Sequence, residues 1–382
     1  MIPLSIPNIS GNEWTYVKDC LDTGWISSVG SYVNLFEEKM AEFTGAKYAV
    51  AAMNGTAALH IALKLSGVRQ GDLVIVPNIT FVASCNAVRY CNADPLLVDI
   101  DQDTWQMDLY LLDEYIEKNT YLVTEDIGGV ETTRPYCSLT HRRIAAIMPV
   151  HVLGNMVDMD RLITLCNKYQ LPIIEDSTEA LGSLYKNRHA GTFGQFGTFS
   201  FNGNKIISTG GGGMIVTNDE YLAKKAKHIT TQAKTDPFEY DHDEIGYNYR
   251  LVNILAAVGV AQMEQLPSFL ERKKAIDKYY RDHLENENLQ FQKVHDHVSP
   301  NNWLHTMKVK EQRPMIKHLL DNGVQCRPFW VPMHQLRMFK HLPFITNDNK
   351  SDTIYKSCIS IPSSTNLTDA QVEEVVRVIQ AF

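Results

Sequence analysis

From residue 47 onward, short apolar stretches alternate with amphipathic stretches of helical periodicity, and this alternation constrains the fold more than any other feature of the chain. The apolar stretches are Tyr48–Met53, Leu73–Val76, Pro95–Ile100, Ile144–Val150 and Pro172–Glu175. The helical stretches between them include Ala57–Leu65 and Met159–Tyr169. Such an alternation predicts an α/β fold with a mostly parallel sheet and helices on both faces, in which ligands bind at the carboxyl ends of the strands.

Two helices are expected to begin at capping boxes, in which a Ser or Thr and the residue three positions later cap each other's backbone. Ser10 with Glu13 marks the first of these helices, and Thr368 with Gln371 marks the last helix of the chain. Residues 120–143 break the alternation and predict an inserted hairpin or loop.

A chain of 382 residues has room for about two domains. Two helices, Asn253–Leu266 and Leu270–Leu284, are predicted after the alternating region, and strand-like and helical segments are mixed beyond them. We therefore place a large domain at residues 1–250 and a smaller C-terminal domain at residues 251–382.

The composition limits the class of protein and its surroundings. Apolar residues make up 44% and charged residues 21% of the chain, as in a globular protein, and the formal charge of -8 disfavours nucleic acid or an anionic membrane as a partner. No apolar run reaches the length of a membrane span, and MIPLSIPN lacks the basic region of a signal peptide. Seven dispersed cysteines without a CxxC pair predict reduced thiols in the cytoplasm and no metal site.

The middle of the chain holds one lysine between two strand-like runs. Phe196–Phe201 favours a buried strand, Gly210–Gly213 a turn, and Met214–Thr217 a second strand. Lys205 lies between the two strands, next to Asn204. Burial in apolar surroundings lowers the pKa of a lysine and makes its amine nucleophilic, as a Schiff-base lysine requires. A surface lysine on a glycine loop is the alternative.

Asp176 closes the apolar run LPIIED and is expected at the carboxyl end of a buried strand. An unpaired buried carboxylate is costly, so a cationic group should face it. Enzymes that use pyridoxal phosphate (PLP) pair the ring nitrogen of the cofactor with an Asp and hold its aldehyde carbon with a Lys. Asp176 and Lys205 together therefore suit PLP chemistry, with a helix N-cap as the alternative role of Asp176.

The segment Asn54–Ala57 lies between a predicted strand and a predicted helix. Backbone N–H groups at such a helix start, together with the Thr56 hydroxyl, can bind a phosphate group. An ordinary capped helix is the alternative. Phe81 follows the next strand and can stack on a cofactor ring, although a single aromatic residue in this position is more often part of a core.

Six motifs occur in a fixed order along the chain, namely GTAALHIAL, VPNITFVAS, PVHVLGN, IIEDSTEALGS, FSFNGNKIISTGGGGM and GYNYRL. Together they resemble the DegT/DnrJ/EryC1/StrS family of PLP-dependent sugar aminotransferases, and the resemblance covers nearly the whole chain. It implies fold type I of the aspartate aminotransferases, with a mostly parallel seven-stranded sheet in the large PLP-binding domain and a smaller α+β domain after it. It also implies a homodimer whose active sites are shared between the two subunits.

The resemblance assigns the contacts with PLP and with its pyridoxamine form (PMP). Lys205 matches the lysine that binds the cofactor, Asp176 matches the partner of the pyridine nitrogen, and Glu179 stands where the family commonly has Gln or His near the 3′-oxygen. The other contacts with the ring and the phosphate match Gly55, Thr56, Ala57, Phe81, Ser200 and, from the second subunit, Asn248. Lys205 also argues against the branch of the superfamily that has histidine here and dehydrates sugars.

The SFNGNK run with its glycine tail, the GYNYRL segment and the insertion at 120–143 narrow the resemblance to one subgroup. Its members use glutamate to aminate C4 of UDP-2-acetamido-2,6-dideoxy-hexos-4-ulose. Their products enter legionaminic acid or bacillosamine-type sugars of bacterial surface glycans, such as the lipopolysaccharide O-antigen. The residues proposed for the sugar site are Trp25, Ser28, Asn155, Arg250, Arg327, Trp330 and His334.

Other acceptors stay open, namely GDP-4-keto-6-deoxymannose, a dTDP-linked keto sugar and a 2,3-diacetamido UDP sugar, and so does the stereochemistry at C4. A fold-type-I lyase such as a desulfurase is disfavoured because no cysteine lies in an evident mobile loop. A PLP-binding regulator without turnover would lack Lys205 or carry an added DNA-binding segment, and the sequence shows neither feature.

Overall fold

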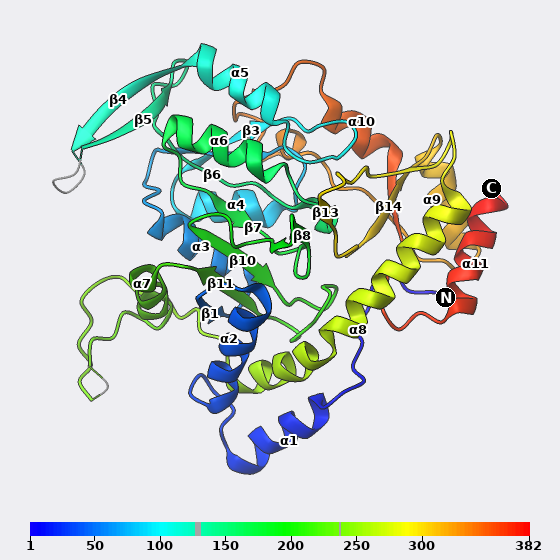
Figure 1. Ribbon diagram of the computed structural model, residues 1–382, viewed down its shortest axis with the longest axis horizontal. Coiled ribbons are helices and arrows are strands. Elements are labelled where there is room, and N and C mark those ends of the chain that lie inside the picture. The colour runs from blue at the N-terminus through cyan, green and yellow to red at the C-terminus, as the bar shows by residue number, and fades with distance from the viewer. Residues whose placement is uncertain (127–130, 237) are drawn as a thin grey trace.

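A computed structural model of the chain describes residues 1–126, 131–236 and 238–382 (Figure 1). The strands of its central sheet are β1 (Tyr48–Ala52), β2 (Leu73–Pro77), β3 (Asp94–Val98), β6 (Ile144–Ile147), β7 (Ile174–Asp176), β10 (Phe196–Ser200), β11 (Gly213–Thr217) and β16 (Phe344–Ile345). Their order is β1–β11–β10–β7–β6–β2–β3–β16, and parallel bridges from Ile147 to Ile173 and from Val150 to Asp176 join the two halves. Within this sheet β11 alone is reversed relative to the other strands. The predicted seven-stranded, mostly parallel sheet is confirmed, and β16 extends it at the β3 edge.

Helices cover both faces of this sheet because its strands are apolar on both sides. One face carries α3 (Gly55–Leu65), α4 (Val82–Tyr90) and α7 (Glu220–Thr230), and the other carries α5 (Leu109–Asn119) and α6 (Met159–Tyr169). In β2, Val74 and Val76 belong to the apolar core under the first three helices, whereas Leu73 and Ile75 belong to the core under α5 and α6. This division follows from the two-residue period of a strand.

Two N-terminal helices, α1 (Glu13–Thr23) and α2 (Ser31–Thr44), pack against the 32-residue helix α8 (Asn253–Leu284). The two helices predicted for this last region are therefore one helix. Pro267 lies inside α8 and removes one backbone donor, but the buried residues Leu266 and Phe269 hold the helix against the core on both sides of it.

The capping box predicted at Ser10 is wrong. Asn12 stands at the N-cap position of α1, and the Ser10 hydroxyl donates instead to Gln265 Oε1 of α8 at 2.7 Å. A tertiary contact has thus replaced the local one. The capping box at Thr368 and Gln371 is confirmed at the start of α11 (Asp369–Gln380).

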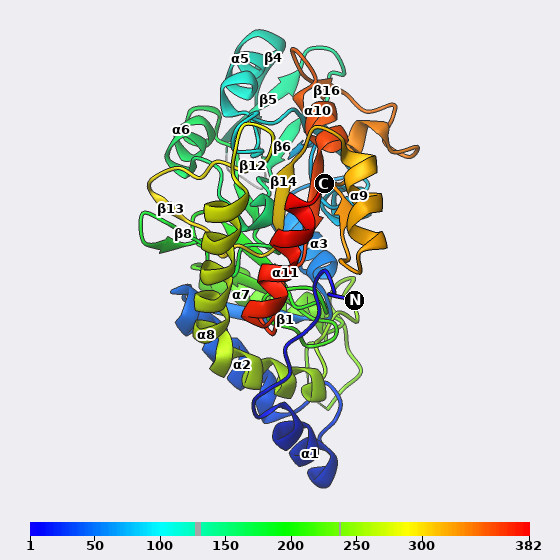
Figure 2. The same ribbon diagram turned by 90° about the vertical axis from the view of Figure 1, so that its right-hand side faces the viewer.

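The C-terminal part has a sheet of its own, with the strand order β12 (Gln290–Phe291), β14 (His305–Lys308), β17 (Cys358–Ile361) and β15 (Arg327–Pro328). Apolar residues of α8, α9 (Gln312–Asp321) and α11 form one core with this sheet. Figure 2 shows α11 beside α8, with the N-terminal segment passing close to both. Shorter elements elsewhere are β8 (Leu184–Tyr185), β9 (Arg188–His189), β13 (Val298–Ser299), α10 (Lys350–Ser357) and the 3-10 turns Val152–Gly154 and Met333–Gln335. The domain division at residue 250 stays a prediction.

The insertion at 120–143 contains a hairpin of β4 (Thr120–Asp126) and β5 (Glu131–Cys137), as predicted, and it projects from the molecule beside α5 (Figure 1). Its residues 127–130 lie outside the described part of the chain. Among the helices that the structure describes, none combines the length and the apolar character needed to cross a membrane.

Candidate active site

A cavity of about 490 Å³ opens where the carboxyl ends of β1, β2, β7 and β10 meet, between the central sheet and the C-terminal sheet. The central sheet and its loops contribute Asn54, Gly55, Thr56, Thr80, Phe81, Ser84, Asp176, Thr178, Glu179, Ser200, Lys205, Gly211 and Gly212. The C-terminal part contributes Trp303, Leu304, Arg327, Pro328, Trp330 and Ser360. The structure therefore brings most of the predicted cofactor residues to one place, as the geometry of a parallel sheet requires.

Lys205 lies in the turn after β10, and its side chain is only 13% exposed. Its Nζ is 3.8 Å from Glu179 Oε1 and 3.9 Å from the centre of the Trp303 ring. The alternative of a surface lysine on a glycine loop is thereby excluded.

Burial and the neighbouring charges act in opposite directions on the pKa of the Lys205 amine. Burial lowers the pKa of the Lys205 amine, and the negative charges of Glu179 and Asp176 oppose that shift. Burial raises the pKa of the Glu179 carboxyl to about 7, whereas Lys205 and a hydrogen bond from the Leu153 N–H at 2.9 Å act in the opposite direction. A lysine in this setting can reach the neutral form that a nucleophile or a base requires.

Asp176 ends β7 and is 2% exposed. Its Oδ2 accepts a hydrogen bond from the Ser84 hydroxyl at 2.7 Å, and its Oδ1 accepts one from the Thr178 hydroxyl at 2.8 Å. In the described chain no helix begins at this point, so the role as an N-cap is excluded. Neutral donors thus fix a buried carboxylate that can face the protonated ring nitrogen of PLP.

The first turn of α3 forms a cradle for an anion. Gly55 and Thr56 line the cavity, and a Cβ on Gly55 would lie 2.9 Å from the Cβ of Ser200, so only glycine allows this close approach. The prediction that the Ala57 N–H binds phosphate is wrong, because that N–H donates to Asn54 Oδ1 at 2.8 Å and caps the helix. The N–H groups of Gly55 and Thr56, with the hydroxyls of Thr56 and Ser200, suit a phosphate at the positive end of α3.

Phe81 precedes α4 and lines the cavity with 56% of its surface exposed. A core role for this ring is excluded, and an exposed ring beside Asp176 and Lys205 suits stacking on a flat cofactor. An amine, a carboxylate, an aromatic face and an anion cradle therefore surround one cavity, and together these residues fit PLP.

The residues predicted for the sugar site fall into three groups. Arg327 and Trp330 line the cavity on its C-terminal side. Asn155 does not reach it, because this residue is buried and its amide donates to the Lys293 carbonyl at 2.9 Å. His334 does not reach it either, because its Nδ1 lies 2.8 Å from the Asn78 amide nitrogen. These last two predictions are corrected, since both side chains hold neighbouring loops.

A third group lies away from the cavity of its own chain. The hydroxyl of Ser28 accepts a hydrogen bond from Arg250 Nη1 at 3.1 Å, and Trp25 is 57% exposed. Tyr247 and Tyr249 stack at 5.0 Å beside the buried His60. The residues between and after these tyrosines, Asn248 and Arg250, are exposed.

Sequence reasoning missed three residues of the site. Thr178 follows Asp176 in an Asx-turn pattern, and Ser84 follows Thr80 by one helical turn, so local spacing contains a signal for both. Trp303 has no such signal, because it is far from Lys205 in the sequence and reaches it only through the tertiary fold.

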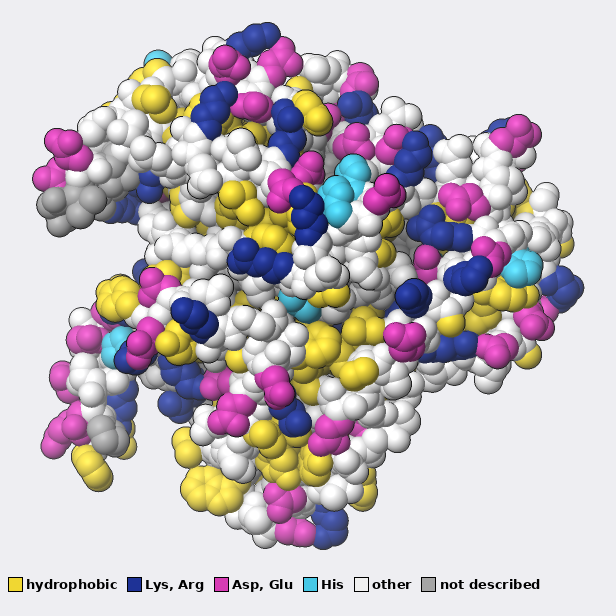
Figure 3. All heavy atoms as spheres, in the orientation of Figure 1, with side chains coloured by type: hydrophobic (Ala, Val, Ile, Leu, Met, Phe, Trp, Pro, Cys, Tyr) yellow, Lys and Arg dark blue, Asp and Glu magenta, His cyan; other side chains and the backbone are white. Residues whose placement is uncertain are grey.

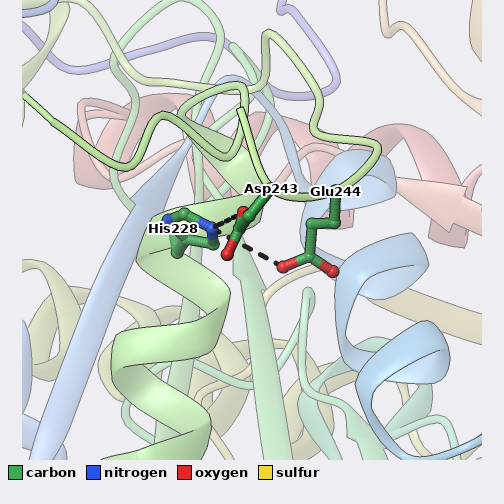
Figure 4. A group of neighbouring side chains, drawn as sticks. All are labelled: His228, Asp243 and Glu244. Atoms are coloured by element: carbon green, nitrogen blue, oxygen red, sulfur yellow. Dashed lines mark hydrogen bonds and ion pairs between the residues drawn. The ribbon is translucent and has the colours of Figure 1, made fainter. Parts of the chain in front are cut away.

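His228 of α7 and Asp243 and Glu244 of the following segment form a group that could hold a metal ion (Figure 4). His228 Nε2 lies 2.7 Å from Asp243 Oδ1, and the Lys225 ammonium group contacts Glu244. These contacts tie the segment before GYNYRL to α7. The group lies outside the cavity that contains Lys205.

The chain is similar to known proteins over nearly its whole length. A sequence model of the DegT/DnrJ/EryC1/StrS aminotransferase family matches residues 7–380. The chain is 38% identical over 384 residues to the GDP-perosamine synthase of Escherichia coli O157:H7, covering 100% of this chain and 98% of that protein. It is 30% identical over 365 residues to the UDP-4-amino-4,6-dideoxy-N-acetyl-β-L-altrosamine transaminase of Campylobacter jejuni 81-176, covering 93% and 90%. Its structure is similar to that of Spr1654 from Streptococcus pneumoniae in its PMP form, with a TM-score of 0.89 and 27% identity over 100% and 98% of the two chains.

Proposed function

The chain belongs to the DegT/DnrJ/EryC1/StrS aminotransferase family and is a PLP-dependent sugar aminotransferase, and from this premise we propose that it transfers the amino group of glutamate to C4 of a nucleotide-linked 4-keto-6-deoxy sugar. The observation that carries the proposal is one cavity that combines a buried amine, Lys205, with a buried carboxylate, Asp176, and the open first turn of α3. On the C-terminal side of the cavity, Arg327 and Trp330 are the proposed contacts of the sugar.

In the proposed mechanism PLP supplies an electron sink when it is bound. With PLP bound, Asp176 would keep the proton on the ring nitrogen, Phe81 would stack on the ring, and the start of α3 with Ser200 would hold the phosphate. Lys205 Nζ removes the proton from Cα of glutamate and, in the second half of the reaction, delivers a proton to C4 of the sugar. A positioned side chain increases the rate of each such proton transfer by roughly 10²–10⁴-fold. Arg327 is the proposed partner of an anionic group of the substrates, since its guanidinium group can bind a carboxylate or phosphate through two donors.

For the acceptor we propose a UDP-linked 2-acetamido-4-keto-2,6-dideoxy hexose, on the basis of the SFNGNK and GYNYRL motifs and the β4–β5 hairpin. The name of the relative from C. jejuni supports a UDP-linked substrate. A GDP-linked 4-keto-6-deoxy sugar is the second candidate. The GDP-perosamine synthase of E. coli is 38% identical to this chain, whereas the transaminase of C. jejuni is 30% identical to it.

We expect kcat/KM for the UDP-linked ketone to exceed that for GDP-4-keto-6-deoxymannose by at least about tenfold, because loss of even one buried hydrogen bond to the substrate costs this much. A panel of UDP-, GDP- and dTDP-linked ketones, assayed with glutamate, measures the ratio. A higher value for the GDP-linked ketone would transfer the assignment to the second candidate and leave the aminotransferase activity standing.

We also propose that the active unit is a homodimer in which Asn248 reaches the partner's cavity. Asn248 is exposed and absent from the cavity of its own chain. Exposed apolar residues gather on α1 and the loop after it, at Trp14, Leu21, Trp25, Ile26 and Val29. Figure 3 shows hydrophobic side chains exposed over the part of the molecule where α1 and α2 lie, and patches of this kind mark interaction surfaces.

Mixing the variants Asn248→Ala and Lys205→Ala tests this sharing of sites. Each variant alone should be nearly inactive, and random mixing should restore about a quarter of the parent activity, since half of the dimers are mixed and each has one intact site. Mixing Asn248→Ala with the double variant Lys205→Ala/Asn248→Ala is the control and should restore nothing. Absence of recovery in the first mixture, with exchange verified by mass spectrometry, would place Asn248 within its own subunit.

A third expectation concerns Glu179. Its negative charge raises the pKa of Lys205, so Glu179→Gln should lower that pKa. The pKa can be read from the cofactor-free protein, because its reaction with PLP requires a neutral amine and speeds up as pH rises through that pKa. The midpoint of the rate against pH should therefore move to lower pH, and a midpoint that moves to higher pH would show that Glu179 does not act through its charge.

A further inference from the structure

Trp303 contacts Lys205 at both ends of the lysine residue. The face of its ring lies 3.9 Å from Lys205 Nζ, measured to the ring centre. Its Nε1–H donates a hydrogen bond of 2.6 Å to the carbonyl of Asn204, the peptide group directly before Lys205. We propose that Trp303 is a positioning residue that holds the Lys205 amine in the cavity and fixes the peptide from which that side chain extends. The proposal rests on the function assigned to Lys205 above.

The backbone of Trp303 is fixed from two sides. Its N–H donates to Asn301 Oδ1 at 3.0 Å, and its carbonyl accepts a hydrogen bond of 2.7 Å from Lys273 Nζ. Lys273 is 3% exposed, and burial lowers its pKa to about 7, so the contact is made by an amine that has left water. These two hydrogen bonds restrict movement of the Trp303 backbone.

Asn301 links Trp303 to the segment that carries Glu179, the other neighbour of the amine. Its side-chain amide donates to the carbonyl of Glu179 at 2.8 Å and to that of Leu181 at 2.9 Å, while its Oδ1 accepts from Trp303. One buried side chain thus fixes the distance between the Trp303 ring and the Glu179 segment. Lys205 Nζ contacts both groups, at 3.9 Å from the ring centre and 3.8 Å from the carboxylate.

Two physical effects follow from this arrangement. The ring face attracts an ammonium group, so the Trp303 ring favours the charged form of Lys205, as the charges of Glu179 and Asp176 also do. The indole hydrogen bond removes rotational freedom from the peptide before Lys205, so the amine is presented in one direction. The first effect depends on an aromatic face, and the second depends on the indole N–H.

The variants Trp303→Leu and Trp303→Phe separate these effects, and Leu4→Ala, which alters the lining of the same cavity at a residue with no role assigned above, is the matched control. The cofactor-free proteins are mixed with saturating PLP, and the rate at which the visible absorption band develops is followed as a function of pH. Trp303→Leu loses the aromatic face, so the ionisation constant of the amine should rise about threefold to thirtyfold and the midpoint should move to lower pH. Trp303→Phe keeps the face, so its midpoint should stay while the limiting rate at high pH falls about tenfold.

The outcome of each variant decides the proposal. If both Trp303 variants keep the midpoint and the limiting rate of the parent, Trp303 is only a wall of the cavity and the proposal is overturned. Circular dichroism reports folding, and if Trp303→Leu does not fold, the limiting rate of Trp303→Phe decides alone. Borohydride reduction and peptide mapping of the parent separate this question from the assigned function, since a pyridoxyl label on another residue would remove the role of Lys205 itself.

Discussion

Replacing Lys205 by alanine is expected to lower kcat for transamination by at least roughly 10⁴-fold, the upper range for one proton transfer by a positioned side chain. The same amine is proposed to move protons in both halves of the reaction, so no half should survive the change. The start of α3, Phe81 and Asp176 are untouched, so Lys205→Ala should still bind PMP. Rapid-quench assays with PMP and the nucleotide-linked ketone measure the residual proton transfer directly.

Lys205→Arg is the matched control for charge. A guanidinium group keeps the positive charge next to Glu179 but stays protonated at any working pH, so it is neither a nucleophile nor a base. We expect Lys205→Arg to be as inactive as Lys205→Ala and similar to the parent in thermal stability. A variant with arginine that retains a tenth or more of the parent rate would show that Lys205 contributes charge alone.

Lys273 provides a second check on this assignment. Among the described residues it is a second lysine whose pKa burial lowers, to about 7, and by that criterion alone it is a candidate nucleophile. Its Nζ, however, donates to the carbonyls of Trp303 and Ser363 and does not line the cavity. After reduction with borohydride, the pyridoxyl group should therefore map to Lys205, and a label on Lys273 would contradict the proposed site.

The parts of the fold that the sequence predicts are those in which pattern and burial agree. Stretches such as Leu73–Val76 are apolar at every position, and in the structure they lie in a sheet with helices on both faces. Asp176 could be predicted for the same reason, because a charge that ends such a run must lie at a strand end, where ligands bind. Lys205 could be predicted because apolar residues follow it in the sequence. In the structure these neighbours, Ile206 and Ile207, are buried.

The errors arise where a distant residue competes with a local pattern. The Ser10 hydroxyl was predicted to cap α1 and instead donates to Gln265 of α8. Asn155 and His334 carry polar groups that suit a sugar, but Lys293 and Asn78 take up their hydrogen bonds. These partners lie far apart along the chain, and nothing in a local window predicts them.

The missed contact of Trp303 has the same origin. Its position opposite Lys205 depends on Lys273 and Asn301, and each of these residues looks like an ordinary surface side chain in the sequence. Contacts of this kind are set when α8 and the segment before β14 pack together, so they follow from the fold and not from a motif. The catalytic residue of a site can thus be predicted from its neighbours in the sequence, whereas the residues that position it can be identified only from the structure.

Asp176→Asn is the second change with a large expected effect. An amide has nearly the shape of the carboxylate and can still accept the hydrogen bond from the Thr178 hydroxyl, so the site should keep its geometry. It carries no charge, however, and cannot keep a proton on the ring nitrogen of PLP. We expect kcat to fall by roughly 10²–10³-fold, the loss seen when one preorganised electrostatic partner is removed, with little change in the amount of PLP bound to Lys205.

The stability of the same variant gives an independent test. In the cofactor-free protein Asp176 is a buried carboxylate whose hydrogen-bond donors, Ser84 and Thr178, are neutral. Exchanging it for a neutral amide removes the cost of burying a charge, so the Tm of cofactor-free Asp176→Asn should equal or exceed that of the parent. The rise in Tm on adding PLP should be smaller than in the parent, because the variant has lost its attraction to the ring nitrogen.

Ser84→Ala, which removes one neutral donor and keeps the charge, is the control, and its rate should stay within about tenfold of the parent. An equal rise in Tm with PLP for Asp176→Asn and the parent would show that Asp176 does not face the ring nitrogen.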